Sequence, residues 1–181
     1  MNQTIQLTTQ RLLLNPISID HAEAIYSYRS DSITNRYQGW IPQDIEDVRS
    51  FIERQVSTEM NVNGTWFQFV VILKETGEVI GDMGLHFIGS ENDEVELGCT
   101  LANEYQGQGY ATEALKEVIS YIFNKLDKNR IIATITPANT RSINLFERLN
   151  FKLETFSRDG KMQNESQTDD LLYALQNNLR L

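Results

Sequence analysis

The sequence predicts an α/β (α+β) fold built on one mixed β-sheet, and two observations support this. First, a glycine-rich turn at residues 106–111 joins an extended apolar run, 95–101, to a helical pattern over 112–126, and a further strand follows at 130–136. Such a strand–helix–strand unit requires a right-handed crossover between parallel strands. Second, extended runs bounded by turns elsewhere predict hairpins, which are antiparallel. The 181 residues, of which 40% are apolar, suit a single domain over 1–181.

The N-terminal part predicts one strand and two helices. The run Arg11–Leu14 is a first strand, which the pair Asn15-Pro16 stops. Asp20 can cap a helix over residues 21–29. A second helix follows Asp44, because apolar side chains recur there at helical spacing, namely Val48, Phe51, Ile52 and Val56.

The middle of the chain predicts three strands in succession. Residues 66–73 are dense in aromatic and β-branched side chains, which is typical of a buried strand. A turn at 75–78 leads to its hairpin partner, residues 79–88. After a polar loop, residues 94–101 form the strand that precedes the glycine turn.

The C-terminal part predicts two helices and then a hairpin. The helix after the glycine turn is amphipathic and is expected to lie on the sheet. Residues 139–149 form a short helix. The runs 151–156 and 171–175 are able to pair as a final hairpin, with the polar segment 157–170 between them.

Composition excludes several classes of protein. The net charge is −9 with a pI near 4.7, which argues against nucleic-acid binding. The negative charge is compatible with a cationic substrate such as an amine, or it only keeps the protein soluble. No apolar run approaches the roughly 18 residues of a membrane span, and no signal peptide is visible, so we expect a cytoplasmic protein with no membrane partner. The single cysteine, Cys99, and the isolated His21 and His86 predict neither a disulfide nor a metal site.

The glycine turn predicts an anion site. A glycine-rich turn between strand and helix leaves backbone N–H groups unpaired at the helix N-terminus, where a pyrophosphate binds well. A dinucleotide fingerprint is disfavoured because Thr112 stands at the third glycine position and no acidic residue ends the next strand. The string of a P-loop is absent. The turn therefore predicts some other diphosphate-containing cofactor.

The turn also fits the pattern Q/R-x-x-G-x-G/A, the acetyl-coenzyme A pyrophosphate loop of the GNAT N-acetyltransferases. Further segments, in the same order along the chain, resemble the RimJ/RimL-like branch of that family, the ribosomal-protein-alanine N-acetyltransferase type. They are Thr8–Leu14 (T-x-R-L-x-L), Glu96–Leu101 (E-I-G-Y-x-L), Gly109–Leu115 (G-Y-A-T-E-A), Asn139–Phe151 (N-x-x-S-x-x-L-x-x-x-L-G-F) and the closing Asp159-Gly160 with Leu172-Tyr173. The departures are Asn150 at a usual glycine and Cys99 at an often aromatic position.

The resemblance implies the GNAT acyl-CoA N-acyltransferase fold. That fold has a twisted, mostly antiparallel mixed sheet of about seven strands, helices on both faces, and a splayed central parallel pair where acetyl-CoA or CoA docks. The implied cofactor-binding residues hold the pyrophosphate on the loop and the pantetheine arm on the preceding strand and the later helix. They are Cys99, Leu101, Gln106, Gly107, Gln108, Gly109, Tyr110, Ala111, Thr112, Asn139 and Ser142. In this family a β-bulge in that strand also turns an amide toward the thioester carbonyl.

Two residues are candidates for catalysis. Glu96 shares a strand face with Gly98 and Thr100, and it could take a proton, directly or through water, from an amine whose pKa is about 10; a structural glutamate is the alternative. Ser142 and Asn139 extend the apolar stripe of their helix, which is unusual for packing. By resemblance Ser142 lies near the sulfur and assists the departing thiolate, and Asn139 hydrogen-bonds the pantetheine or, alternatively, only caps the helix.

The resemblance thus implies an enzyme that moves an acetyl group from acetyl-CoA to a primary amine by direct attack in a ternary complex. The acceptor is a protein N-terminus or a small amine, such as a polyamine or aminoglycoside, met by the variable region 24–51. A covalent acetyl-cysteine route is disfavoured. The alternatives are an acyl-CoA sensor without turnover and a nucleotide-binding enzyme. A homodimer is possible by resemblance.

Overall fold

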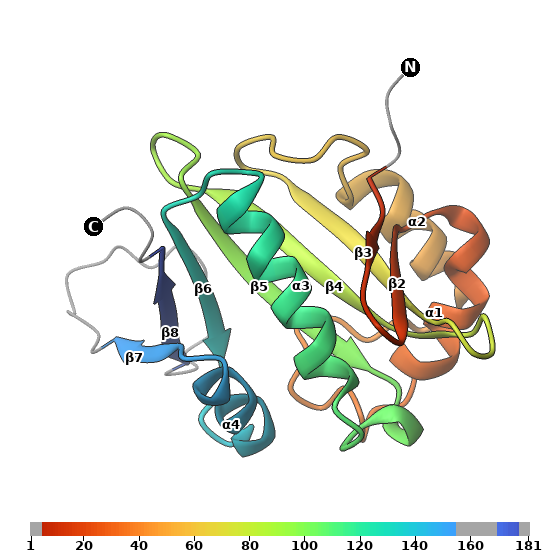
Figure 1. The fold of residues 1–181 in the computed structure, drawn as a ribbon. Coiled ribbons are helices and arrows are strands. Elements are labelled where there is room, and N and C mark those ends of the chain that lie inside the picture. The colour runs from red at the N-terminus through yellow and green to blue at the C-terminus, as the bar shows by residue number, and fades with distance from the viewer. Residues whose placement is uncertain (1–4, 155–169, 178–181) are drawn as a thin grey trace.

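The computed structural model describes residues 5–154 and 170–177, and over these residues the chain forms an eight-stranded sheet with helices on both faces (Figure 1). The strands are β1 (Leu7–Thr8), β2 (Leu12–Pro16), β3 (Trp66–Leu73), β4 (Val79–Ile88), β5 (Glu94–Leu101), β6 (Arg130–Ile135), β7 (Lys152–Glu154) and β8 (Leu171–Gln176). The helices are α1 (Ala22–Arg29), α2 (Ile45–Gln55), α3 (Tyr110–Asn124) and α4 (Thr140–Arg148), with single 3₁₀ turns η1 (Ile19–His21) and η2 (Asn103–Tyr105).

The sheet is mixed, as the sequence predicts. Its order is β1-β2-β3-β4-β5-β6-β8-β7, and every neighbouring pair is antiparallel except β5 and β6. The bounds of β3, β4 and β5 agree residue for residue with the prediction, because turns delimit dense apolar runs there. The eighth strand is β1, whose two residues are too few to carry a periodic pattern.

The helix starts show where local capping differs from expectation. The prediction that Asp20 caps the first helix was wrong: Ser18 caps the 3₁₀ turn η1, and its backbone N–H donates to His21 Nδ1 at 2.9 Å. The second helix, α2, follows Asp44 as predicted, and Asp44 caps it, since its side chain accepts from the Asp47 N–H at 2.9 Å. Helix α3 begins at Tyr110, two residues before the predicted start.

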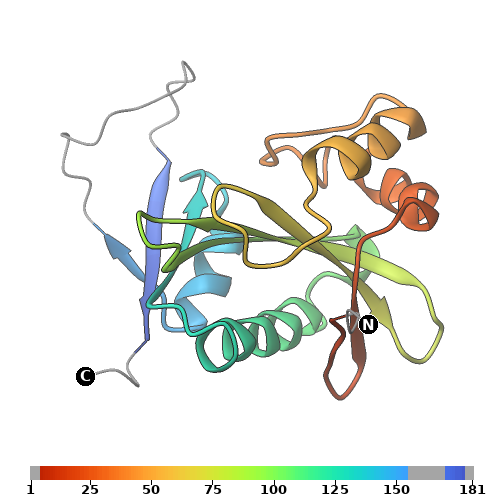
Figure 2. The same cartoon turned by 90° about the horizontal axis from the view of Figure 1, so that it is seen from above.

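Helices cover the sheet in two layers, which Figure 2 shows from above. Helices α3 and α4 lie on one face, and α1 and α2 lie on the other. The larger core lies under α3, and its fully buried side chains include Phe69, Leu85, Leu115 and Ile122. A smaller core joins α1 and α2 to the opposite face through Ile25, Val48 and Val70.

The parallel pair diverges soon after it begins. Strands β5 and β6 pair at only three positions, Glu94–Glu96 with Arg130–Ile132, although β5 continues to Leu101 and β6 to Ile135. The backbone groups of these strand ends therefore lack a partner strand on their inner side, and the sheet opens there. The prediction of a splayed central parallel pair is confirmed.

The C-terminal hairpin closes the sheet. Strand β8 lies between β6 and β7, so the last two strands pair as predicted but the later one is inserted next to the central strand. Residues 155–156 of the predicted strand and the pair Asp159-Gly160 lie outside the described residues. No helix in the described ranges is both long and apolar enough to cross a membrane.

Candidate active site

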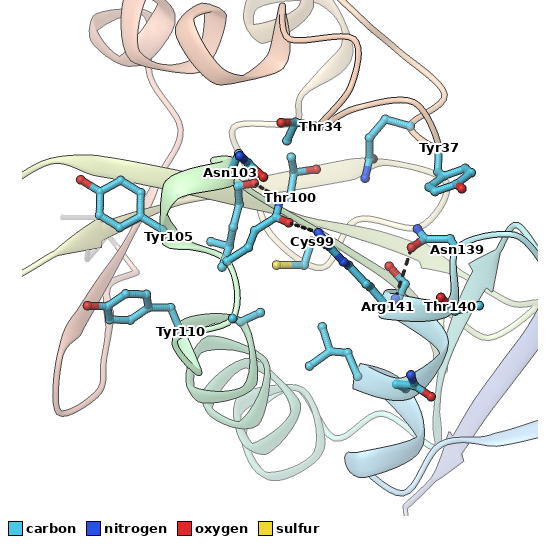
Figure 3. Close-up of a pocket in the computed structure, with 18 of the residues that line it drawn as sticks. Thr34, Tyr37, Cys99, Thr100, Asn103, Tyr105, Tyr110, Asn139, Thr140 and Arg141 are labelled. Atoms are coloured by element: carbon cyan, nitrogen blue, oxygen red, sulfur yellow. Dashed lines mark hydrogen bonds between the residues drawn. The ribbon is translucent and has the colours of Figure 1, made fainter.

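A cavity of about 1080 Å³ lies where β5 and β6 diverge. Its wall comes from the glycine loop, the end of β5, the start of α4 and the loop between α1 and α2. Figure 3 shows Tyr105 and Tyr110 on one side of this opening and Asn139 and Arg141 on the other. The cavity brings together most of the residues expected to bind the cofactor, namely Cys99, Leu101, Gln106, Gly107, Gly109, Tyr110, Ala111, Thr112, Asn139 and Ser142.

The glycine loop presents a row of free backbone donors. Gly107 (φ +76°) and Gly109 (φ +84°) hold the left-handed conformation that glycine adopts without strain. Helix α3 has no side-chain cap, and its first backbone bond is from the Glu113 N–H to Gly109 O. Within the described residues, the six consecutive N–H groups from Gly107 to Thr112 therefore have no acceptor. These donors and the helix dipole fit a phosphate group.

The two glutamines of the loop behave differently. Gln106 bridges the opening: its Nε2 donates to Leu101 O at 2.9 Å, and its Oε1 accepts from Arg141 Nη1 at 3.2 Å. The side chain of Gln108 turns away from the cavity and donates to Glu104 O at 2.7 Å. Gln108 therefore offers the site its backbone amide rather than its side chain.

A carboxylate of α3 ties the glycine loop to the N-terminal strands. Glu113 accepts from Thr9 Oγ1 at 2.5 Å and pairs with Arg11 Nε at 2.6 Å. The Arg11 guanidinium also donates to Gln108 O at 3.1 Å and lies 4.3 Å from the ring centre of Tyr110. Partial burial by itself raises the pKa of Glu113, but the hydrogen bonds from Thr9 and Arg11 outweigh it and hold this pKa below its ordinary value. Glu113 is thus held ionised behind the loop.

Strand β5 turns two of its amides toward the opening. The Ala102 N–H donates to Ile80 O on β4, and backbone groups alternate in direction along a strand. The N–H groups of Cys99 and Leu101 therefore point away from β4, toward the divergence. The expectation of a β-bulge in β5 is wrong, because the register of β5 with β4 is continuous. An irregularity of register occurs instead between β3 and β4, at Val71/Ile72.

Cys99 lies in the cavity wall as a neutral thiol. Burial, together with the negative charge of Asp82, raises the pKa of the Cys99 thiol to about 12. A group with this pKa is protonated at neutral pH, and a protonated thiol is a poor nucleophile. The cysteine therefore has the properties of a wall residue.

Helix α4 places Asn139 and Ser142 together at the cavity. The Asn139 side chain caps the helix by accepting from the Ser142 N–H at 3.3 Å. Both residues also line the cavity, so the cap and a binding role are compatible. The Ser142 hydroxyl has no hydrogen-bond partner within residues 5–154 and 170–177, which leaves it available to a ligand.

Glu96 is the one candidate catalytic side chain that does not line the cavity. Its carboxylate lies 3.4 Å from Nδ1 of His86, and the His86 ring stacks on Trp66 with ring centres 4.6 Å apart. Gly98, on the same strand face, has no atom within 4 Å of the place where a Cβ would lie. Space for water therefore exists beside the strand between Glu96 and the cavity end at Thr100.

The α1–α2 loop forms the wall opposite the glycine loop. It contributes Tyr37, whereas Trp40 stacks on Phe51 at 4.6 Å and does not reach the cavity. The whole loop lies within the variable region 24–51, where acceptor contacts are expected. No group of three or more metal-ligating side chains occurs within the described ranges.

Behind this wall lies a buried ion pair that sequence reasoning missed. Arg29 donates to both carboxylate oxygens of Asp82, at 2.9 and 2.6 Å, and Tyr28 donates to the same group at 2.7 Å. Arg29 also lies 3.3 Å from Thr100 Oγ1 at the cavity. Only the register of Asp82 opposite Thr100 brings these groups together, so no local pattern indicated the pair.

Comparison with known proteins agrees with this arrangement. The family model described as "Acetyltransferase (GNAT) domain" matches residues 11–152. The N-acetyltransferase p20 of Bacillus licheniformis is 34% identical over 170 residues, which cover 93% of this chain and 94% of that protein. The ribosomal-protein-serine acetyltransferase of Escherichia coli is 24% identical and covers 96% and 97% of the two chains.

Solved structures share the fold. A GNAT-family acetyltransferase from Bacillus anthracis is 26% identical, with a TM-score of 0.80 over 96% of this chain and 99% of that one. The ribosomal L7/L12 α-N-protein acetyltransferase RimL in complex with coenzyme A has a TM-score of 0.77 at 18% identity, over 95% and 98%. The family model covers most of this chain, and ribosomal-protein acetyltransferases are among its relatives. The chain therefore belongs to the GNAT N-acetyltransferases.

Proposed function

We propose that this enzyme transfers an acetyl group from acetyl-CoA to the amine at the N-terminus of a protein or peptide. The observation that carries the proposal is that one cavity is lined both by the glycine loop, whose six N–H groups have no partner in the described residues, and by Ser142, whose hydroxyl is free there. Membership of the GNAT family supports the donor, and the ribosomal-protein acetyltransferases among the relatives support a protein acceptor. A small amine is the second candidate acceptor.

The residues that line the cavity suit the chemistry of coenzyme A along its length. The amides of the glycine loop, which begins at Gln106, would hold the pyrophosphate. The amides of Cys99 and Leu101 would pair with the pantetheine arm as a neighbouring strand does. Asn139 would hydrogen-bond the same arm while it caps α4.

Acetyl-CoA supplies the acetyl group as a thioester, and we propose that groups of this chain transfer the protons of the reaction. Glu96 accepts a proton from the incoming ammonium through water in the space beside Gly98, because an amine with a pKa of about 10 attacks only when neutral. An amide on the open side of β5 donates to the carbonyl oxygen as it gains negative charge. As the carbon–sulfur bond breaks, Ser142 donates its proton to the departing thiolate and regains a proton from the acylated nitrogen, which becomes the neutral amide. No acyl-enzyme forms, so the transfer is direct.

The decisive experiment measures release of free thiol from acetyl-CoA against a panel of peptides, polyamines and aminoglycosides. We expect turnover with at least one peptide bearing a free N-terminus, and none with the same peptide blocked by acetylation. Tight CoA binding without thiol release for any acceptor would instead favour an acyl-CoA sensor. Calorimetric titration with CoA, NAD and ATP separates the nucleotide-binding alternative, since only CoA is expected to bind.

Three further properties belong to the same proposal. We propose that residues 1–181 fold as a single domain and that the enzyme acts in the cytoplasm, because its one cysteine is a free thiol. A homodimer is expected from the family resemblance. Light scattering of the purified chain tests the dimer, and a mass equal to 20.8 kDa would exclude it.

A further inference from the structure

Helix α4 turns one face toward the cavity, and an arginine stands at each end of that face. Arg141, Asn144, Leu145 and Arg148 all line the cavity. Arg141 and Arg148 are seven residues apart, which is two helical turns, so they share the face and lie about 10 Å apart along the axis. The predicted apolar stripe of this helix did not include either arginine, because their exposed positions resemble an ordinary solvated face.

The charge of the cavity is opposite to that of the whole chain. The chain has a net charge of −9, yet the described residues of the wall include Arg36, Arg141 and Arg148 and no aspartate or glutamate. Outside the cavity, four arginines lie against carboxylates, in the pairs Arg11–Glu113, Arg29–Asp82, Arg49–Glu46 and Arg130–Glu94. The described arginines of the cavity wall lie against no carboxylate, so their charge is available to a ligand.

The two arginines on α4 have no acidic partner within the described residues. Arg141 donates to the neutral Gln106 side chain at 3.2 Å, and no hydrogen bond or ion pair engages Arg148. Glu147, beside Arg148 in sequence, accepts instead from Tyr173 Oη at 3.1 Å. Guanidinium groups bind phosphate through paired N–H donors, so two unpaired arginines on one cavity wall indicate an anionic ligand with phosphate chemistry.

The position of the pair indicates which phosphate. Arg141 contacts Gln106, the first residue of the glycine loop, so its guanidinium lies beside the amides assigned to the pyrophosphate. Arg148 lies two turns further along the same wall. Coenzyme A carries a second phosphate, on the 3′-oxygen of its ribose, separated from the pyrophosphate by the sugar. A wall with one cation beside the loop and another further along matches this separation.

We propose that Arg148 binds the 3′-phosphate of coenzyme A while Arg141, beside the glycine loop, adds to the pyrophosphate site, so that the enzyme selects CoA over 3′-dephospho-CoA. The proposal rests on the proposed use of coenzyme A. Arginines that were merely solvated would not distinguish the two molecules, which differ only in that phosphate.

Isothermal titration calorimetry of the whole chain with CoA and with 3′-dephospho-CoA tests this selectivity. We expect the wild type to bind CoA at least about tenfold more tightly, the scale of one charge-assisted contact. Arg148→Gln should weaken CoA binding about tenfold and bind the two molecules nearly equally, whereas Arg141→Gln should weaken the binding of both molecules by the same factor. Arg54→Gln is the matched control, because Arg54 lies on α2 outside the cavity.

The outcomes separate cleanly. If Arg148→Gln loses affinity for CoA and 3′-dephospho-CoA by the same factor, Arg148 binds the pyrophosphate and the proposal is wrong. If its affinities equal those of the wild type, Arg148 is solvated and the proposal is equally wrong. If the folded wild type binds neither molecule, the proposed function itself fails. Circular dichroism of each variant establishes that the chain is folded.

Discussion

At the scale of single residues, the cavity separates side chains that act from side chains that form its wall. Ser142 and Cys99 both line the cavity, and each side chain carries an exchangeable proton. Ser142 keeps a hydroxyl without a partner in the described structure, whereas the Cys99 thiol has a pKa of about 12. The first residue is therefore equipped to donate to a leaving group, and the second is not equipped to attack.

Replacing Ser142 by alanine tests the first of these roles. Ser142→Ala should lower kcat by about tenfold to a hundredfold, the low end of general acid catalysis, with little change in CoA affinity. Steady-state thiol release and calorimetry measure the two quantities separately. Ser50→Ala, on α2 outside the cavity, serves as the control. An unchanged kcat in Ser142→Ala would remove Ser142 from the mechanism.

Replacing Cys99 by alanine tests direct transfer. Cys99→Ala should keep turnover within about threefold of the wild type, because this thiol is not the nucleophile. Alkylation of the wild-type protein by iodoacetamide should be slow at pH 7 and accelerate about tenfold for each unit of pH until the pKa of about 12 is approached, since only the thiolate reacts. Rapid alkylation at pH 7 that also abolishes activity would indicate an acetyl-cysteine route.

At the scale of elements, the glycine loop depends on the turn between β1 and β2, which is far away in sequence. Thr9 and Arg11 both hold Glu113 on the first turn of α3, and Arg11 also contacts the loop at Gln108 and Tyr110. A carboxylate at this end of a helix is also favoured by the dipole. The turn between β1 and β2 therefore holds the glycine loop in place at the start of α3.

Glu113→Gln should destabilise the protein at neutral pH and lose that effect in acid. The pKa of Glu113 is depressed in the fold, so its contribution is present above its unfolded value near 4.5 and is lost as the pH falls through the lower folded value. Urea unfolding should show a loss of about 2 kcal/mol at pH 7, the scale of a charge-assisted hydrogen bond. The difference from wild type should shrink below pH 4.5.

The neighbouring Glu117, on the same helix, provides the control for this experiment. No hydrogen bond or ion pair engages Glu117 in the described residues, so Glu117→Gln should leave stability within about 0.5 kcal/mol of the wild type at either pH. A loss in Glu113→Gln that persisted equally at low pH would mean that packing, and not the ionised contact, holds the loop.

At the scale of the whole molecule, charge is distributed unevenly. The net charge of −9 is compatible with a cationic acceptor, yet the described cavity wall bears three arginines and no carboxylate. The overall charge therefore describes the outer surface and does not describe the site.

The buried ion pair Arg29–Asp82 joins helix α1 to strand β4 of the sheet. Removing one partner leaves an uncompensated buried charge, so Asp82→Asn should destabilise the chain by about 3–5 kcal/mol in urea unfolding. Replacing both groups by apolar residues of similar size, Arg29→Met with Asp82→Leu, should recover much of that loss. Equal destabilisation in the single and double variants would show that the pair contributes through packing alone.

Local patterns accounted for much of the fold. The central strands β3, β4 and β5 were predicted to the residue, since turns interrupt dense apolar runs at their ends. The two-residue β1 and the Ser18 cap were not, because such short features carry no periodicity and several polar residues compete to cap one turn. The outward turn of Gln108 and the pairing of Glu96 with His86 depend on contacts between neighbouring elements, which spacing does not reveal.

The sequence by itself determined the family, the α/β class and the glycine loop, because these depend on the order of residues within one or two adjacent elements. Only the tertiary structure decided what meets across the opening. Arg141 faces Gln106, Arg29 joins Asp82, and Thr9 reaches Glu113 over distances of 35, 53 and 104 residues along the chain. Strand register and helix packing create these contacts, and neither leaves a local mark in the sequence.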